Sequence, residues 1–235
     1  MSAGLRKGEA IDALRAALPV MAGYVSVGLP CGIMEQQAGM DAFQALALSC
    51  LFYSGAGQFM IAGMWLAGSP IVAIAASVSA VSARQVLYGA SLAKFCDKAG
   101  KGLAFLFAAG VTDETFGVNV QRFGSGSWKV TQALLVNVLS CASWTGANVA
   151  GVLLGEVVAI PVAIGAFAMT SIFVCLLFSQ DGSAANVAVA IAAFAGVAAC
   201  KLAGLSGAAV VAGAVVGVAA GIAFVQMRGD ADVDR

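Results

Sequence analysis

Isolated charges in apolar sequence are the residues of this chain that could do chemistry. Arg84 is the only charged residue among the 52 that separate Asp41 from Lys94. Two adjacent acids, Asp113 and Glu114, interrupt a second apolar stretch. An arginine at the centre of a membrane helix costs roughly 2.5 to 3.5 kcal/mol on insertion scales, and intramembrane acids are functional hypotheses by default. These three side chains therefore need partners, either one another or a charged solute.

The isolated position of Arg84 can be explained in two ways. With Gln85 beside it, its guanidinium could bind the carboxylate of a substrate in a bidentate manner, or it could pair with an acid of the protein. Alternatively it could snorkel to the membrane surface. Lys94 lies ten residues further on, about 15 Å of helix. Snorkelling therefore requires the helix to end soon after Arg84.

Asp113 and Glu114 point about 100° apart if they lie on a helix. One acid could then meet Arg84, while the other faces a cavity, binds an ammonium group or carries a coupling proton. If the segment is a surface loop instead, both acids are simply solvated.

The segment Tyr53-Ser-Gly-Ala-Gly-Gln58 interrupts an apolar helix. Gly55 and Gly57 each weaken a helix by about 1 kcal/mol relative to alanine. A broken turn frees backbone amides, and with Ser54 and Gln58 these could bind a carboxylate, as interrupted helices do in transporters. Alternatively, the glycines only permit close helix packing.

The composition is typical of an integral membrane protein. Of 235 residues, 61% are hydrophobic and 10% are charged, whereas soluble domains have about 25% charged residues. The apolar segments are long runs without the alternation of barrel strands. We therefore predict an all-α, polytopic bundle of helices in the lipid bilayer, some of them broken. The net charge of zero gives no indication of nucleic-acid binding.

Several classes of chemistry are disfavoured by what the sequence lacks. Histidine is absent, and the six cysteines never approach a C-x-x-C spacing. This argues against a metal site, a redox pair and histidine-based catalysis. The sequence also has no phosphate-binding loop and no recognisable catalytic motif. We therefore expect no enzyme activity, no cofactor and no metal.

Intervals without charge predict the membrane spans. The longest, 42–83, could hold two crossings, with a break at Ala67-Gly-Ser-Pro70. The segment 102–121 either crosses or re-enters. Seven or eight spans follow, and counting Lys and Arg leaves the side of the amino terminus open. The remaining intervals are 16–34, 130–155, 157–180, 182–200 and 202–227. We expect a single transmembrane domain over 1–235, with an amphiphilic tail at 1–15, a bundle at 16–227 and a polar tail at 228–235.

Three glycines spaced four apart, Gly213, Gly217 and Gly221, form one face of the last predicted helix. Small residues at this spacing let helix backbones approach closely. The face could pack within the chain or receive another subunit.

Taken together, these motifs resemble the AzlC family, the large subunit of bacterial branched-chain amino-acid exporters. The resemblance covers about 16 to 227 and rests on four features. They are Pro19 with Gly23, Gly28 and Gly32, then Tyr53-Ser-Gly-Ala-Gly-Gln-Phe59, then Arg84 followed by Leu87-Tyr-Gly-Ala-Ser-Leu-Ala93, and finally Thr112-Asp-Glu-Thr-Phe116.

The resemblance implies ion-gradient-driven export of leucine, isoleucine and valine, with methionine as a further candidate, across the bacterial inner membrane. It also implies a small hydrophobic partner subunit of the AzlD type. The chain departs from the family twice. Ser82-Ala-Arg-Gln85 stands where the family commonly has Asn-Leu-Arg-His, and Ala166 stands where an acid often precedes the aromatic at Phe167. Either change could alter the substrate or the coupling ion.

Two other classes of function remain open. The same glycine-rich helices could line a pore for small solutes or ions. The chain could also be an assembly subunit without transport of its own, for which the glycine face at 213–221 would be the docking surface.

Overall fold

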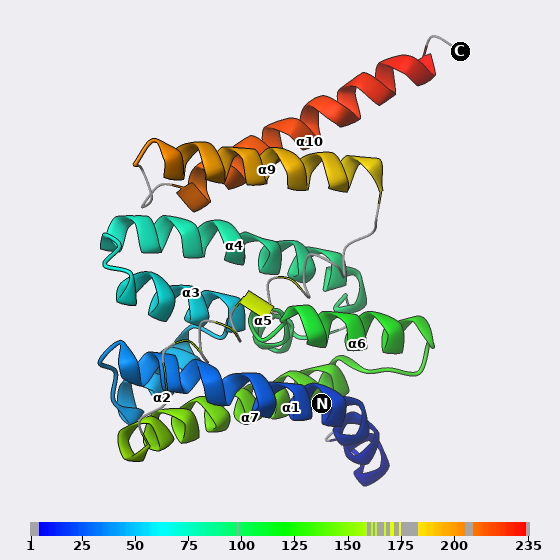
Figure 1. The fold of residues 1–235 in the computed structure, drawn as a ribbon. Helices are drawn as coiled ribbons and strands as arrows, with labels where there is room; N and C mark the ends of the chain where they lie inside the picture. Colours follow the sequence, from blue (N-terminus) through cyan, green and yellow to red (C-terminus); the bar gives the residue numbers. More distant parts are fainter. Residues whose placement is uncertain are drawn as a thin grey trace. The chain divides into compact units, whose positions relative to one another are not determined.

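The structure is a computed structural model that describes 5–97, 99–158, 161, 163, 167, 170, 171, 174, 183–204 and 209–233. These residues form helices and no strands, as predicted (Figure 1). The helices are α1 (Lys7–Gln37), α2 (Ala42–Leu51), α3 (Gly55–Leu66), α4 (Ile71–Leu92) with the short helix η1 (Ala93–Phe95), α5 (Lys101–Ala109), α6 (Asp113–Gly124), α7 (Val130–Val157), α9 (Ala184–Leu202) and α10 (Ala209–Val233).

The chain divides into two compact units. The first comprises Met1–Gly63 and Ser82–Met169, and the second comprises Met64–Val81 and Thr170–Arg235. The single domain expected for 1–235 stays a prediction.

Four helices in the described part of the chain are long and apolar enough to cross a membrane. They are Lys7–Gln37, Ile71–Phe95, Val130–Val157 and Ala184–Leu202. The chain is therefore a multi-pass helical membrane protein. Most of the span predicted at 157–180 lies outside the described residues, and so does Ala166. The predicted tail at 1–15 is helical from Lys7 onward, and α10 continues to Val233, beyond the predicted end at 227.

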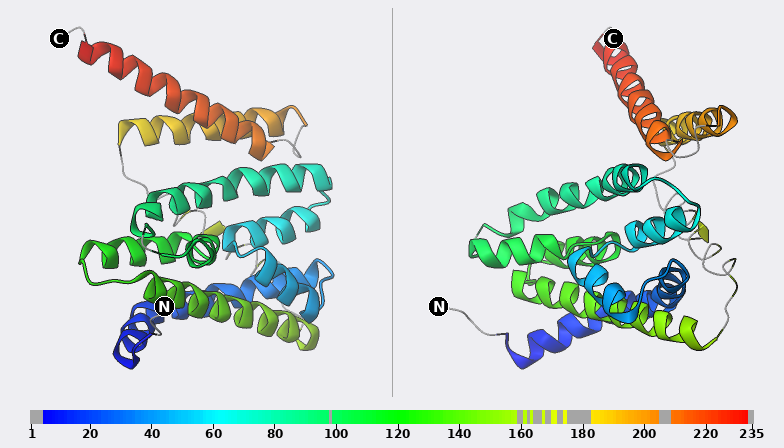
Figure 2. Two further views of the ribbon diagram at one scale, coloured as in Figure 1. Left: turned by 180° about the vertical axis from the view of Figure 1, so that it is seen from behind. Right: turned by 90° about the vertical axis from the view of Figure 1, so that its left-hand side faces the viewer.

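In the first unit, α1 and α7 run side by side in the same direction (Figures 1 and 2). Contacts advance along both helices together. The Nζ atom of Lys129 lies 2.6 Å from Oε1 of Glu9 near the two starts. Further along, the hydroxyl of Ser143 donates to the carbonyl of Met21 over 2.9 Å.

Glycine makes this contact close. A Cβ on Gly32 would lie 2.0 Å from the carbonyl oxygen of Asn148, and one on Gly151 would lie 2.3 Å from the carbonyl oxygen of Leu29. No side chain fits at such distances, so only glycine allows the two backbones to touch.

The segment from α5 to α6 enters the bundle and leaves at the same end. Phe95, just before α5, stacks on Phe123 near the end of α6, with ring centroids 4.4 Å apart. Trp128, two residues before α7, packs on the same cluster. Helices of nine and twelve residues reach about 14 and 18 Å, less than the roughly 30 Å hydrocarbon core. The segment 102–121 is therefore re-entrant, which was one of the two predicted alternatives.

A similar break divides α2 from α3. The interval 42–66 was expected to cross once, but it forms helices of ten and twelve residues separated by 52–54. In Figure 1, α3 runs back toward the end of the unit at which α2 begins. The break at Ala67–Pro70 lies between α3 and α4, as predicted. The interval 42–83 thus contributes one full crossing, α4, and not two.

The parallel course of α1 and α7 supports a single crossing between them. Two crossings in the same direction require an odd number of crossings between them. α4 supplies one, because its end at Leu92 packs near Ala133 at the start of α7. The pairs α2–α3 and α5–α6 therefore enter the bundle from opposite ends.

In the second unit, α9 and α10 pack against each other through the predicted glycine face (Figure 2). A Cβ on Gly213 would lie 2.4 Å from Val197 and 3.0 Å from the carbonyl oxygen of Ala193. Gly217 and Gly221 also face α9. The glycine face is therefore occupied within the chain.

Candidate functional site

Arg84 lies in α4 and forms an ion pair with the first residue of α6. Its Nη2 atom is 2.8 Å from Oδ2 of Asp113, and the two side chains are 30% and 24% exposed. The hydroxyl of Tyr88, one turn further along α4, donates to the other carboxylate oxygen of Asp113 over 2.5 Å. α4 continues for eight residues beyond Arg84 to Leu92, so the early helix end that snorkelling requires does not occur.

The break between α5 and α6 places the acids. Thr112 is the N-cap of α6, with φ −116° and ψ 178°, and it exchanges hydrogen bonds with Thr115. Gly110 begins the break and lies close to Asn137 of α7. Asp113 and Glu114 thus occupy the first turn of a helix, where the helix dipole favours negative charge.

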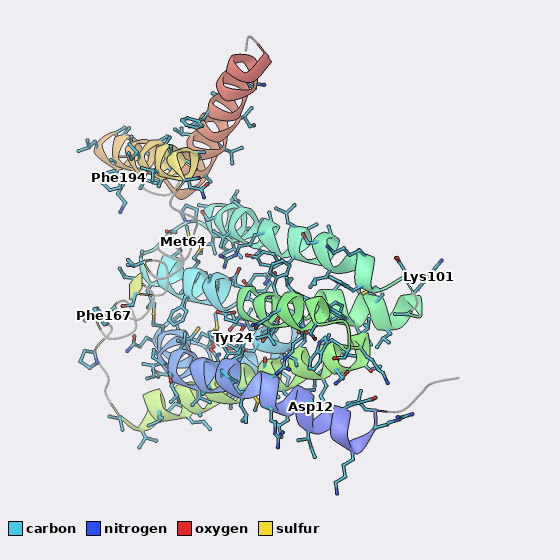
Figure 3. All side chains as sticks on the ribbon, turned by 90° about the vertical axis from the view of Figure 1, so that its right-hand side faces the viewer. Asp12, Tyr24, Met64, Lys101, Phe167 and Phe194 are labelled. Carbon is cyan, nitrogen blue, oxygen red and sulfur yellow. The ribbon has the colours of Figure 1, made fainter. Side chains whose placement is uncertain are left out.

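Tyr24 of α1 holds the second acid. Its hydroxyl donates to Oε2 of Glu114 over 2.6 Å and lies 2.6 Å from Oγ1 of Thr112. Figure 3 shows Tyr24 inside the first unit, whereas Asp12 and Lys101 lie at its edge. A buried hydroxyl in an apolar helix therefore orients Glu114.

The break between α2 and α3 reaches the same place. The side-chain amide of Gln85 donates to the carbonyl oxygen of Tyr53 over 3.2 Å. The rings of Tyr24 and Tyr53 meet edge to face, with centroids 6.3 Å apart. Tyr24 and the pair Arg84–Gln85 thus each contact both breaks, so the two re-entrant segments converge on one site.

Three of the residues predicted to bind substrate at the first break have partners within the protein. Oε1 of Gln58 accepts hydrogen bonds from Trp144 at 2.8 Å and Ser49 at 3.4 Å. Its amide donates to the carbonyl oxygen of Phe52. The hydroxyl of Ser54 accepts from the amide of Gly57 over 3.3 Å.

Gly57 also has a packing role, since a Cβ there would lie 2.6 Å from the ring of Phe52. The amides of Gly55 and Ala56 are the first two of α3, and a helix does not satisfy its first amides internally. Substrate contacts by these glycines, Ser54 and Gln58 stay predictions.

The sequence assigned no role to the side chains of Tyr24, Tyr88 or Thr112, although Tyr88 and Thr112 lie within motifs that carry the family resemblance. A signal existed for Thr112, because Thr-x-x-Thr before an amphipathic stretch is typical of a helix N-cap. No local pattern distinguishes Tyr24 or Tyr88 from other aromatic residues in apolar helices. Their partners lie 88 and 25 residues away in the chain.

Comparison with known proteins places these features in a family. The family described as AzlC protein matches residues 19–158. This chain belongs to the AzlC family. The matched region runs from α1 to the end of α7 and contains the close helix contact, both breaks and Arg84.

Several AzlC relatives are similar at moderate identity. The inner membrane protein YgaZ of Escherichia coli (strain K12) is 29% identical over 149 residues, which cover 62% of this chain and 61% of that protein. The branched-chain amino acid transport protein AzlC of Bacillus subtilis (strain 168) is 26% identical over 166 residues, covering 69% and 64%. An uncharacterized membrane protein of Helicobacter pylori (strain ATCC 700392 / 26695) is 27% identical over 170 residues, covering 72% and 74%.

The match thus spans less than two thirds of the E. coli and B. subtilis relatives. No solved structure matches this member of the AzlC family.

Proposed function

We propose that this protein is the large subunit of a secondary transporter that exports leucine, isoleucine and valine, with methionine as a further candidate substrate. The observation that carries the proposal is the ion pair of Arg84 and Asp113, placed where two helix breaks converge. Membership of the AzlC family supports the substrate class, since one relative is named a branched-chain amino acid transport protein.

The chemistry of the site suits a zwitterion. An amino acid carries one anionic and one cationic group, and it can cross an apolar core only where both are compensated. Arg84 supplies a planar donor for the carboxylate. Asp113 and Glu114 supply oxygens for the ammonium group. Without substrate, Arg84 and Asp113 compensate each other, and Glu114, which is exposed, accepts a hydrogen bond from Tyr24.

Binding would exchange one ion pair for two. The substrate carboxylate replaces Asp113 at the guanidinium of Arg84, and the first amides of α3 can add hydrogen bonds at the positive end of that helix. The ammonium group takes the carboxylate that Arg84 releases. The stacked rings of Tyr88 and Phe116, 4.5 Å apart between centroids, offer apolar surface beside Asp113 for a branched side chain.

The partner and the location belong to the same proposal. We expect a small, hydrophobic AzlD-like subunit and a position in the bacterial inner membrane, as the family resemblance implies. Co-purification with such a subunit, and loss of transport in its absence, would support a two-subunit transporter. Full transport by this chain alone would exclude that requirement.

The test is leucine efflux from preloaded cells, with expression of each variant measured. Arg84→Ala, Asp113→Asn and Glu114→Gln should each reduce efflux strongly. Asp12→Asn and Lys101→Ala, which change exposed charges, are the matched controls and should not. Wild-type efflux in all three site variants would overturn the proposal. Conductance or flux insensitive to the proton gradient would favour a pore instead.

A further inference from the structure

Glu35 is a carboxyl group inside the first unit that the proposed substrate site does not use. It lies on α1, seven residues after Gly28 and three after Gly32, and so on the helix face that touches α7. Its side chain is fully buried, with a relative exposure of 0%. In the sequence, Glu35 is only the charged residue that ends the uncharged interval 16–34.

The carboxylate of Glu35 lacks the partners that a charged group needs. Oε1 lies 3.8 Å from the sulfur of Cys31, a weak donor, and Oε2 is buried without a hydrogen-bond partner in the described part of the chain. Oδ1 of Asn148, on the facing surface of α7, is also a buried acceptor without a donor. The contact between α1 and α7 thus contains two buried acceptors without donors.

The groups on neighbouring elements do not compensate a negative charge at Glu35. The ion pairs recorded among described residues join Arg84 to Asp113 and Lys129 to Glu9. Within α1, the other titratable groups near this end are Cys31 and Tyr24, and Tyr24 bonds to Thr112 and Glu114. The elements packed against α1 carry Cys141 and Glu156 on α7, Asp41 and Cys50 at α2, and Asp113, Glu114 and Arg122 on α6. Glu156, Asp41 and Cys50 are exposed, and so is Arg122, which lies over the ring of Trp128.

An unpaired carboxylate in an apolar interior costs several kcal/mol or more, and such a group takes up a proton instead. A protonated Glu35 carries no charge, so its burial no longer requires a cationic partner. The other intramembrane acids differ, because Asp113 is paired with Arg84 and Glu114 accepts from Tyr24.

We propose that Glu35 is a proton-binding site distinct from the Arg84 site, and that it carries the proton that drives transport. This inference rests on the proposed transport function. Glu35 follows Tyr24 by eleven positions along α1, about 16 Å of helix, so the two sites lie at different depths. In each cycle the carboxylate takes up one proton from one side of the membrane, becomes neutral, and releases that proton to the other side.

The protonation itself is tested without transport. Infrared spectra of the purified, full-length protein should show the carbonyl band of a protonated carboxylic acid, and Glu35→Gln should remove it. Glu156→Gln, which changes an exposed acid of α7, is the matched control and should leave the band. A spectrum in which Glu35→Gln removes no protonated-acid band would overturn the proposal.

The coupling role is tested in proteoliposomes by two leucine assays. In exchange at equal pH, Glu35→Gln should retain activity, because the Arg84 site is intact. In flux driven by a pH gradient, the same variant should lose its response, whereas Glu35→Asp and Glu156→Gln should keep one. A gradient response retained by Glu35→Gln would overturn the coupling role. If the wild-type protein exchanges no leucine even when it is reconstituted with the small partner subunit, the proposed function fails, and the infrared result still decides whether Glu35 holds a proton.

Discussion

The guanidinium of Arg84 and the carboxylate of Asp113 lie 2.8 Å apart, and each side chain keeps a quarter to a third of its surface exposed. The pair is therefore compensated but still open to a solute. α4 supplies the cation, and the break before α6 supplies the anion. The ion pair joins a helix that crosses the membrane to a re-entrant segment. Breaking the pair would therefore affect both elements.

Neutralising one member of the pair should destabilise the protein more than neutralising both. Arg84→Gln or Asp113→Asn alone leaves a partly buried charge unpaired, which we expect to cost about 1 to 3 kcal/mol. The double variant should regain most of this stability and still fail to transport leucine. Unfolding in detergent measures the first effect and efflux measures the second. A double variant as unstable as the single ones would contradict the pairing.

The hydroxyl of Tyr24 should contribute to stability, and that of Tyr53 should not. Tyr24→Phe removes contacts with Thr112 and Glu114 and should cost about 1 to 2 kcal/mol. Oη of Tyr53 is buried without a hydrogen-bond partner among the described residues, so Tyr53→Phe is the matched control and should change stability by less than about 0.5 kcal/mol. Thermal unfolding of the two purified variants compares them, and equal losses would argue against the assigned bonds.

A methyl group at the contact of α1 and α7 should be poorly tolerated. Gly32→Ala places a Cβ 2.0 Å from a backbone oxygen, and we expect it to cost about 3 kcal/mol or more because backbone cannot rotate away. Gly23→Ala, on the same helix with nothing within 4 Å, should be neutral or stabilising by roughly 0.5 to 1 kcal/mol. Yield and thermal unfolding of the two variants provide the measurement. Similar behaviour would mean that the two helices are further apart.

The glycine face of α10 should contribute to the stability of this chain in the absence of a second subunit. Gly213→Val should lower thermal stability of the purified chain, since even a Cβ meets Val197 and the backbone of Ala193. Ala214→Val alters an exposed position next to it and should have little effect. If Gly213→Val reduced only the recovery of a second subunit, the face would serve docking instead.

The re-entrant course of α5–α6 can be measured by thiol labelling from the two sides of the membrane. In a cysteine-free background, Asp97→Cys and Ser127→Cys should react with an impermeant maleimide from the same side. Val157→Cys, at the other end of α7, should react from the opposite side. Labelling of Asp97→Cys and Ser127→Cys from opposite sides would show that the segment crosses.

Composition alone determined the class of this protein. With 61% hydrophobic and 10% charged residues, the chain has to place its helices in lipid, because exposing so much apolar surface to water is unfavourable. Local signals also located the breaks at 67–70 and near Gly55, since proline and glycine act on the backbone where they stand.

Only the tertiary structure decided which segments return and which residues meet. The interval 42–83 has the length of two crossings, and length does not distinguish a crossing from a re-entrant pair. The roles of Tyr24 and Tyr88 depend on contacts with a distant segment of the chain. Glu35 looks like a connector charge in the sequence and is fully buried in the fold. Burial and pairing are set by which faces pack together, and no local pattern of residue types contains that information.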